Sequence, residues 1–426
     1  MFKCKPLAAA IIAILAAQAH AADNNAEQNQ SGVGNMAEVT QSGGRDNLSY
    51  QSQVGEGNDG TVSQNQSTLS DALQTQAGNR NLADIVQTST QQSEAIQEQY
   101  GDDNSASVSQ SDSFGASSRQ YQDGGRNTSF VEQAGADLST AVTDQKGNGN
   151  FAEAVQTNTE SSASEQTQVG DENVSLVMQN GGARNDATVY QQGNLNDASV
   201  YQTNAYDSSA RIDQQGDSQV ASVSQQGSEH SASINSSGLM NEAYIDQSGT
   251  LQTASVYQDG TSNSVDIFQA GESNTATTEQ TGNNNYMTVD QLDGSQLTTS
   301  LQQTGQYNEA YVTQAGTGHV IDFAQDGADN LLTASQTGSN NELTGSSQGD
   351  GDTVDVVQSG DLNAADVQQL YGSDNLVSLA QAGEGNLAQV VQGGMANQAM
   401  LNQSGMGDTA MVTQMGSGNM ATVTQQ

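Results

Sequence analysis

Polar and apolar residues alternate over short stretches of the chain, and these stretches recur at fixed distances. Residues 76–87 read QAGNRNLADIVQ and residues 99–110 read QYGDDNSASVSQ, and both fit Q-x-G-x-x-N-x-A-x-[VI]-x-Q. In the first stretch Asn81, Ala83 and Ile85 occupy alternate positions, and the residues between them vary from copy to copy. A period of two is typical of a β-strand with one buried face. The pattern therefore predicts a strand after each G-x-x-N, with the recurrent face inside.

The glutamines set the length of the repeat. One series recurs at a constant interval from Gln30 to Gln214, and a second series from Gln41 lies between, so that steps of 11 and 12 residues alternate. Beyond Gln214 most steps are 11 residues, and a step of 12 is assigned to Gln302–Gln314. Unequal alternating steps indicate a unit of roughly 22–23 residues with two halves, within the range of periods that solenoids use. We count 35 half-units, or about 17.5 units.

The recurrent residues are too small for a globular core, but they can stack on copies of themselves one unit away. Parallel rungs about 4.8 Å apart let every backbone N–H and C=O pair with the next rung. Asn and Gln side chains both donate and accept, so they can form ladders along the stack. The sequence therefore predicts an all-β fold, a parallel amyloid-like β-solenoid of about 17.5 rungs with two strands per rung.

One amide ladder is predicted at the first Gln and at the Asn of each unit, with glycine in the arc between them because glycine tolerates φ > 0. Asn is expected to share that tolerance in the arcs. The ladder glutamines are Gln30, Gln53, Gln76, Gln99, Gln122, Gln145, Gln168, Gln191 and Gln214. The ladder asparagines are Asn35, Asn58, Asn81, Asn104, Asn127, Asn150, Asn173 and Asn196. The arc glycines are Gly32, Gly55, Gly78, Gly101, Gly124, Gly147, Gly170 and Gly193.

The two halves of each unit differ in the N-terminal part of the chain. Up to about residue 168, one half has glutamine at the inward place where the other half has a branched apolar residue. These residues predict a second ladder, broken by Thr143, and its members are Gln51, Gln74, Gln97, Gln120 and Gln166. From Val189 and Ile212 onward the place is apolar. We therefore expect the N-terminal rungs to be individually less stable than the C-terminal ones.

The first residues are typical of a secretory signal peptide. Two lysines precede an apolar run that is too short to span a bilayer, and small residues follow it. Cleavage is predicted after Ala21, with Ala22 as the alternative. The predicted organisation is a signal peptide at 1–21, a short N-terminal segment at 22–29 and a repeat solenoid at 30–426.

Composition and charge restrict the function. Cleavage removes the only cysteine, so we expect no disulfide in the exported chain. It leaves seven Lys and Arg against 49 Asp and Glu, a net charge of −42, which disfavours nucleic acid and anionic membranes as partners. We also expect no stable membrane insertion. Acidic residues in arcs and on the outer face are expected to oppose premature pairing of strands.

No constellation of residues in the sequence predicts catalysis, a cofactor or a metal site. The seven basic residues of the exported chain are scattered, and His230 and His319 stand at the Asn place of their units, as substitutes in the ladder. The Asp350-Gly351-Asp352 stretch leaves calcium binding open, but a solvated charged turn explains it better because the nonapeptide of calcium-binding β-rolls is missing. We therefore expect a protein that is not an enzyme.

The repeats resemble the curlin repeat family, whose members are subunits of curli amyloid fibres on Gram-negative bacteria. The family pattern is S-x5-Q-x-G-x-x-N-x-A-x3-Q. Complete copies begin at Ser70, Ser93 and Ser139, and the resemblance covers about residues 30–426. The first copy consists of Ser70, Gln76, Gly78, Asn81, Ala83 and Gln87. The chain has more repeats than typical curli subunits, and it has residues 22–29 in place of their Gly-rich secretion segment.

The resemblance implies a secreted protein of the cell-surface fibre of a Gram-negative bacterium. Such subunits cross the outer membrane unfolded, with the help of secretion machinery, and then polymerise with themselves and with other curlin-type subunits. The fibres serve cell adhesion and the biofilm matrix. Because of the missing Gly-rich segment, the resemblance does not determine which secretion pore the chain uses.

The repeat pattern continues to both ends of the repeat region, with no capping segment that the sequence shows. Unpaired outer strands favour end-to-end self-assembly. The residues expected at the polymerising C-terminal edge are Gln414, Gly416, Asn419, Ala421, Val423 and Gln425. Two alternatives remain open, a non-polymerising solenoid adhesin and a minor nucleator of another fibre subunit. An ice-binding solenoid is disfavoured, since the outward positions form no regular threonine array.

Overall fold

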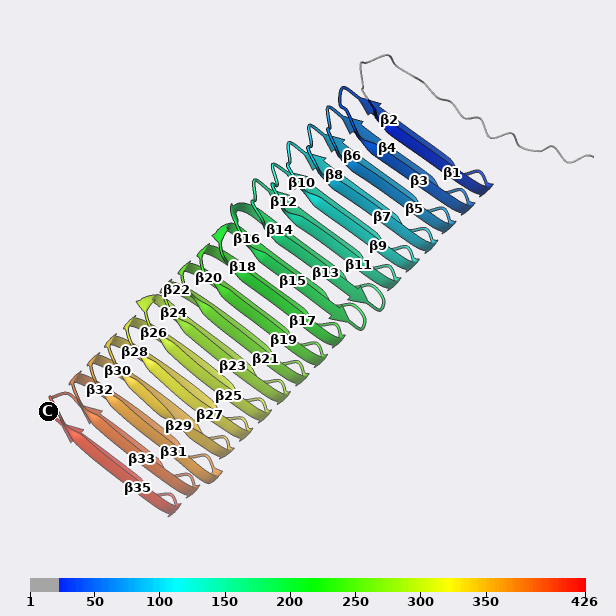
Figure 1. The fold of residues 1–426 in the computed structure, drawn as a ribbon. Helices are drawn as coiled ribbons and strands as arrows, with labels where there is room; N and C mark the ends of the chain where they lie inside the picture. The colour runs from blue at the N-terminus through cyan, green and yellow to red at the C-terminus, as the bar shows by residue number, and fades with distance from the viewer. Residues whose placement is uncertain (1–22) are drawn as a thin grey trace, which may run out of the picture.

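The computed structural model describes residues 23–426, and all regular elements in this range are β-strands (Figure 1). The predicted signal peptide and both candidate cleavage positions, Ala21 and Ala22, lie outside the described residues. The strands form a straight stack in which odd-numbered strands make one sheet and even-numbered strands make the other, with 18 strands in each. The predicted parallel β-solenoid is confirmed.

The first sheet, sheet A, comprises the odd-numbered strands. They are β1 (Asn25–Val33), β3 (Leu48–Glu56), β5 (Asp71–Asn79), β7 (Glu94–Asp102), β9 (Ser117–Gly125), β11 (Thr140–Asn148), β13 (Ala163–Val169), β15 (Asp186–Gln192), β17 (Ser209–Asp217), β19 (Ser231–Leu239), β21 (Thr253–Thr261), β23 (Thr275–Asn283), β25 (Thr298–Gln306), β27 (Val320–Ala328), β29 (Glu342–Asp350), β31 (Ala364–Ser373), β33 (Leu387–Met395) and β35 (Thr409–Ser417).

The second sheet, sheet B, comprises the even-numbered strands. They are β2 (Met36–Ser42), β4 (Asp59–Asn65), β6 (Leu82–Thr88), β8 (Ser105–Ser111), β10 (Thr128–Ala134), β12 (Phe151–Thr157), β14 (Val174–Ala183), β16 (Asp197–Tyr206), β18 (Val220–Ser228), β20 (Glu242–Thr250), β22 (Ser264–Glu272), β24 (Tyr286–Ser295), β26 (Glu309–Thr317), β28 (Leu331–Ser339), β30 (Thr353–Asp361), β32 (Leu376–Glu384), β34 (Gln398–Gln403) and β36 (Met420–Gln425).

Each strand pairs in parallel with the strand two further along the chain, so a residue meets its own equivalent in the next rung. In sheet A, Gln76 of β5 lies opposite Gln99 of β7. In sheet B, Ile85 of β6 lies opposite Val108 of β8. Like side chains therefore stack on like, and this is why the sequence repeats its inward residues and lets its outward residues vary.

The arcs between the strands explain why shorter and longer steps alternate along the sequence. In the N-terminal half, residues 80–81 link β5 to β6, whereas residues 89–93 link β6 to β7. The longer arc carries one extra pairing, in which Gln91 bridges Thr68 and Phe114. In the C-terminal half both kinds of arc have two residues, such as 218–219 and 229–230, except that residues 404–408 link β34 to β35. Up to β13 the longer steps thus belong to the longer arcs, which follow the strands of sheet B, whereas after the ten-residue strands β14 and β16 the extra residue belongs to the strand.

Two details of the predicted repeat need correction. The longer step assigned to Gln302–Gln314 comes one half-unit earlier, because an extra residue widens the end of β24 and shifts its register between Leu292 and Ser295. Gln303 is therefore the buried ladder residue, paired with Gln280. The solenoid also begins before residue 30, because β1 starts at Asn25 and pairs with β3 from its first residue.

The inner faces of the two sheets form the core, and its chemistry changes along the stack. From Val177 to Val412 the buried apolar side chains make one continuous cluster. The apolar cluster of the N-terminal half is much smaller and runs from Val62 to Ala154. Buried glutamine and serine fill the remaining inward places there, for example Ser49 and Gln51. The predicted change from a polar to an apolar core is confirmed.

Candidate functional site

The glutamines of sheet A place their amides on one line inside the solenoid. Gln76 Nε2 donates to Gln99 Oε1 in the next rung at 3.0 Å and to the backbone oxygen of Asp59, in the facing strand β4, at 3.0 Å. The same Nε2-to-Oε1 bond joins each consecutive pair from Gln30 to Gln214. Each amide therefore couples two rungs and the two sheets. Ser236 takes the next place and donates to Gln258.

Sheet B contains the ladder that runs without a break through the part of the chain that the structure describes. It starts at Gln41 and ends at Gln425, with every Nε2-to-Oε1 distance between 2.7 and 3.0 Å. Apart from Gln425, these glutamines are absent from the predicted site residues, although their regular spacing was visible in the sequence. Because the ladder has no substitution, sheet B supplies the more uniform template for stacking.

The second predicted ladder has its predicted break at Thr143, and it is longer than predicted at its N-terminal end. Its bonds join Gln51, Gln74, Gln97 and Gln120, and Gln28 adds a member before them. The ladder stops because Gln120 Nε2 donates to Ser129 Oγ, which also contacts Thr143. Gln166 is therefore separate. Its Nε2 donates to the backbone of Glu153, and its Oε1 is buried with no donor among residues 23–426.

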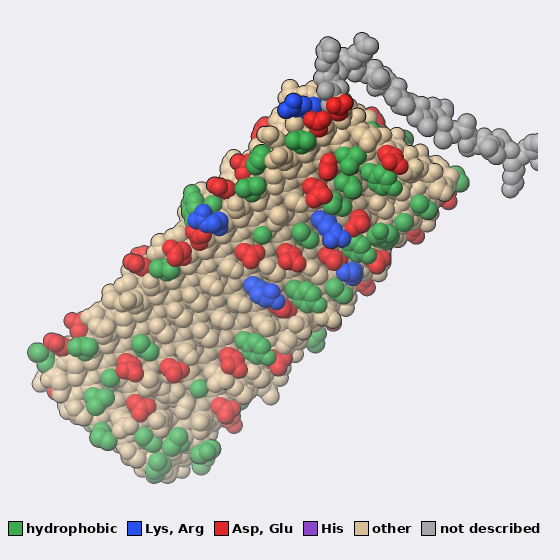
Figure 2. Space-filling model, viewed as in Figure 1, with side chains coloured by type: hydrophobic (Ala, Val, Ile, Leu, Met, Phe, Trp, Pro, Cys, Tyr) green, Lys and Arg blue, Asp and Glu red, His purple; other side chains and the backbone are tan. Residues whose placement is uncertain are grey.

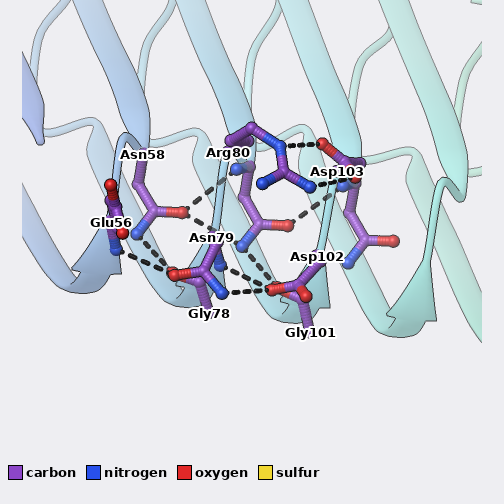
Figure 3. Close-up of polar contacts among 10 residues, drawn as sticks. Glu56, Asn58, Gly78, Asn79, Arg80, Gly101, Asp102 and Asp103 are labelled. Atoms are coloured by element: carbon purple, nitrogen blue, oxygen red, sulfur yellow. Dashed lines mark hydrogen bonds and ion pairs between the residues drawn. The ribbon is translucent and has the colours of Figure 1, made fainter.

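Asparagine connects three successive rungs (Figure 3). The Asn81 backbone N–H and Nδ2 both donate to Asn58 Oδ1, at 3.0 and 3.1 Å, and Nδ2 also donates to the carbonyl of Gly101 at 2.8 Å. Asn58 bonds in the same way to the carbonyl of Gly78. The predicted asparagines and arc glycines thus form one hydrogen-bonded column.

The arc backbone differs from the prediction in one respect. The residue in the left-handed conformation is the one before the asparagine, such as Arg80 with φ 56°, and Asn81 itself has no positive φ. Gly78 has φ 133°, and a Cβ there would overlap the carbonyl oxygen of Gly101 in the next rung. Glycine is therefore required by the stacking of rungs as well as by its own backbone. Asparagine is required because its side-chain amide makes the hydrogen bonds between rungs.

Polar contacts on the exposed side of the arcs join neighbouring rungs as well (Figure 3). Asn79 accepts from the backbone N–H of Glu56 and donates to Asp102 Oδ1 at 2.8 Å. Arg80 binds Asp103 through two hydrogen bonds of 2.6 and 2.7 Å. The guanidinium holds the pKa of Asp103 below its ordinary value, mainly through these bonds. Both side chains are solvated, so the pair contributes little to stability.

The two buried histidines stand in the asparagine column that precedes sheet A, as predicted. His319 Nε2 lies 3.1 Å from the carbonyl of Ala315, and its Nδ1 accepts from the backbone N–H of Asn341 at 3.1 Å. This arrangement assigns the proton to Nε2. His230 Nε2 lies 3.0 Å from the carbonyl of Gln226. Burial lowers the pKa of both imidazoles, which favours their neutral form. Only His319 continues the ladder, because His230 Nδ1 has no partner among residues 23–426.

Asp352 corrects the prediction of a solvated charged turn at Asp350-Gly351-Asp352. Its side chain is fully buried because it occupies the place of an asparagine in the column between Asn330 and Asn375. Its Oδ1 accepts from the backbone N–H and Nδ2 of Asn375, at 2.9 and 3.0 Å. Its Oδ2 has no hydrogen-bond partner among residues 23–426. Burial raises the pKa of this carboxyl, and the nearby Asp374 and Asp350 raise it further.

The residues predicted for the C-terminal edge lie together on the last rung. Gln414 and Gly416 belong to β35, Asn419 lies just before β36, and the other three lie on the inner face of β36. Within the described chain, β35 pairs on one side with β33, and β36 pairs on one side with β34. Ala421 and Val423 are only partly buried against the core. The edge therefore presents ladder amides beside half-covered apolar residues.

Residues 23–426 contain neither a metal cluster nor a membrane-spanning helix. No group of three or more His, Cys, Asp or Glu side chains is placed to hold a metal ion. No helix in this range is long and apolar enough to cross a membrane.

Comparison with known proteins gives one family. A family model described as Curlin associated repeat matches residues 206–238, 260–292, 349–383 and 394–426. All four matches lie in the part of the chain where the shorter step between glutamines dominates. None of the curated proteins matches the chain.

Proposed function

This chain carries curlin repeats, and we propose that it is a structural subunit of an extracellular curli-like amyloid fibre. Solenoids stack end to end in the fibre, which serves bacterial adhesion and the biofilm matrix. Outer-membrane secretion machinery delivers the chain to the cell surface before it folds.

One observation carries the proposal. The amide ladder of sheet B repeats the same bond in the same direction from Gln41 to Gln425, so every rung is a template for the next. Within the described chain, Gln425 Nε2 donates only to the backbone oxygen of Thr409. Its second N–H corresponds to the one that each earlier glutamine of the ladder donates to the next rung. A further rung can therefore add with the bonds that already join the rungs.

The charge distribution favours end-to-end over lateral assembly. All seven basic residues of the described chain lie between Arg45 and Arg211, and residues 212–426 contain 24 Asp and Glu with no Lys or Arg. Figure 2 shows the basic side chains on the N-terminal half of the visible face. Repulsion between such acidic solenoids opposes lateral contact and keeps the chain soluble before it stacks. The two C-terminal strands add no charge repulsion of their own, because residues 409–426 carry no charged side chain.

The test is assembly of purified residues 22–426 diluted from denaturant. Thioflavin T fluorescence, with fragmented fibres of the same chain added as seeds, measures growth. X-ray diffraction of the product measures the spacing of the strands. The proposal predicts fibres with a reflection near about 4.7–4.8 Å along the fibre axis and a lag phase that seeds abolish. A β-rich protein that remains monomeric at high concentration would instead indicate the solenoid adhesin.

A further inference from the structure

The two outermost rungs of the described chain carry nearly the same sequence. Residues 30–41 read QSGVGNMAEVTQ and residues 414–425 read QMGSGNMATVTQ, which are identical at nine of 12 positions. The first segment runs from β1 through its arc to β2, and the second runs from β35 through its arc to β36. Gln, Gly, Asn, Ala, Val and Gln occur at the same offsets in both, and the spacing between the two glutamines is also the same. The two ends can therefore meet as two neighbouring rungs do.

The hydrogen-bonding groups at the two ends are complementary. At the N-terminal end, Gln30 and Gln41 use Nε2 to bond Gln53 and Gln64, which leaves their Oε1 atoms to accept. At the C-terminal end, the Oε1 atom of Gln414 accepts from Gln392. One end thus offers acceptors and the other offers donors, in the same direction as inside the solenoid. Only a head-to-tail arrangement of two copies pairs the donors of one end with the acceptors of the other.

The core is incomplete at both ends in matching places. Val39 at the N-terminal end and Val423 at the C-terminal end are partly buried apolar residues packed against the core. Inside the stack the equivalent side chains, such as Val62 and Leu401, are at most 3% exposed. Head-to-tail contact places Val423 on Val39 and Met420 on Met36, two methionines that are 68% and 60% exposed. Burial of these side chains favours the contact.

Two buried polar atoms at the ends lack partners within residues 23–426, and they are of opposite kinds. Asn24 Nδ2 is a donor in the first rung and Asp408 Oδ2 is an acceptor in the last rung. Both residues occupy the column that precedes sheet A, where Asn47 bonds to Asn24 and Asp408 bonds to Asn386. Continuing this column places Asn24 of one copy next to Asp408 of another.

The chain already contains this pairing once. In the other column Asp352 Oδ1 accepts two hydrogen bonds from Asn375 in the following rung while Oδ2 has no partner among residues 23–426, so by analogy Asp408 Oδ1 accepts from Asn24. We propose that a second copy of this chain docks with its Asn24–Gln41 rung on the Asp408–Gln425 rung, in the register that pairs Asp408 with Asn24, Gln414 with Gln30 and Gln425 with Gln41. This junction rests on the proposed fibre function and names its partner surface residue by residue.

One inward position does not repeat across the junction, because Val412 meets Gln28 there. The Gln28 Oε1 then has no ladder donor. The fold already accommodates one such oxygen. Gln166 Oε1 is buried without a donor in the described chain, because the preceding rung has Thr143 in the equivalent place. Sheet B, in which Met, Ala, Val, Thr and Gln all match, therefore fixes the register.

Disulfide trapping tests the register directly. Thr40 and Thr424 are exposed outward residues of β2 and β36 that the junction pairs, and these are the first and last strands of sheet B. Paired Cα atoms of neighbouring parallel strands are about 4.8 Å apart, within the range of about 4.4–6.8 Å that a disulfide spans. The variant Thr40→Cys/Thr424→Cys has no other cysteine after cleavage. The matched control Asn29→Cys/Thr424→Cys places the first cysteine on sheet A.

Fibres are grown under reducing conditions and then oxidised. The junction predicts covalent chains of many copies from Thr40→Cys/Thr424→Cys and monomers from the control. Fibres that give equal crosslinking in both variants, or none in the first, would overturn the junction and leave the fibre function standing. If the unsubstituted chain forms no fibres, the fibre function itself is refuted.

A charge test addresses the Asp408–Asn24 pair. Asn24→Asp places a carboxylate opposite Asp408 and is expected to slow seeded elongation about tenfold or more, because it replaces a charge-assisted hydrogen bond by repulsion. Asp408→Asn in the same chain is expected to restore most of the rate. An unchanged rate in Asn24→Asp, or no recovery in the double variant, would contradict the pairing.

Discussion

Replacing Asp352 by asparagine should stabilise the solenoid locally. At other rungs the amide in this place makes the bonds that Asp352 cannot make. Asn330 Nδ2, one rung earlier, donates to Asn308 Oδ1 at 3.0 Å and to the carbonyl of Gly349 at 2.9 Å. In the register of the column, the amide introduced at position 352 would donate to Asn330 Oδ1 and to the carbonyl of Gly372. The substitution Asp352→Asn therefore converts a buried oxygen without a partner into a donor with two acceptors.

The size of the effect follows from these bonds. A buried polar atom left without a partner costs about 1–3 kcal/mol, and a hydrogen bond contributes about 1 kcal/mol. We expect Asp352→Asn to raise the free energy of local opening by about 2 kcal/mol at pH 7. This corresponds to roughly 30-fold slower amide exchange, since about 1.4 kcal/mol is a factor of ten.

The gain should depend on pH in a defined direction. Burial raises the pKa of Asp352 above its ordinary value of 3.8 in the folded chain, so the folded state binds the proton more tightly than the unfolded state does. The ionised carboxyl therefore lowers stability above its folded pKa. That cost disappears as the pH falls below 3.8, where both states are protonated. The advantage of asparagine should shrink over the same range.

The assay is hydrogen exchange measured by mass spectrometry on peptides covering residues 342–383, in the full chain. Asp355→Asn is the matched control, because Asp355 is an exposed residue on the outer face of β30 and the substitution changes net charge equally. Equal exchange in Asp352→Asn and the unsubstituted chain at pH 7 would refute the reasoning. A gain of the same size at pH 3 would refute its electrostatic part.

Three further predictions follow from the same structure. Gly78→Ala should weaken the rungs around β5 and β7 by about 3 kcal/mol or more, because the added Cβ overlaps a backbone oxygen in the next rung and alanine rarely adopts this φ. Gly57→Ala, at φ 68° with no backbone atom near its Cβ, should cost only about 1–2 kcal/mol; similar amide exchange in the two variants would contradict this account. Rungs before about residue 168 should exchange their amides faster than rungs after Val189, since polar side chains fill much of their core; slower exchange there would count against it. Assembly should accelerate as salt rises or as the pH falls toward the isoelectric point of about 4.1, and equal thioflavin T kinetics at low and moderate ionic strength would exclude this role of charge.

Most of the fold was predictable because a rung must match the next rung. The period, the parallel pairing and the inward placement of Ala83, Ile85 and Gln87 all follow from repetition in the sequence. These features could be predicted without the three-dimensional contacts, since each residue contacts its own equivalent in the next rung.

Features that depend on a single rung were harder to predict. The shift to Gln303 arises from one extra residue near the end of β24, where Gln302 and Gln303 are chemically identical. The burial of Asp352 was missed because an aspartate beside Gly351 is typical of an exposed turn. Gln28 was missed because the residues before Gln30 contain no complete motif. In each case the decisive information is which side chain faces inward at that rung.

The most direct test of the central claim is cryo-electron microscopy of fibres grown from residues 22–426. The account predicts a filament one solenoid wide, in which parallel rungs follow one another at about 4.8 Å through the boundary between copies, with sheet B of one copy continuing into sheet B of the next. A filament whose copies meet side by side, or whose strands at the boundary are antiparallel, would contradict it.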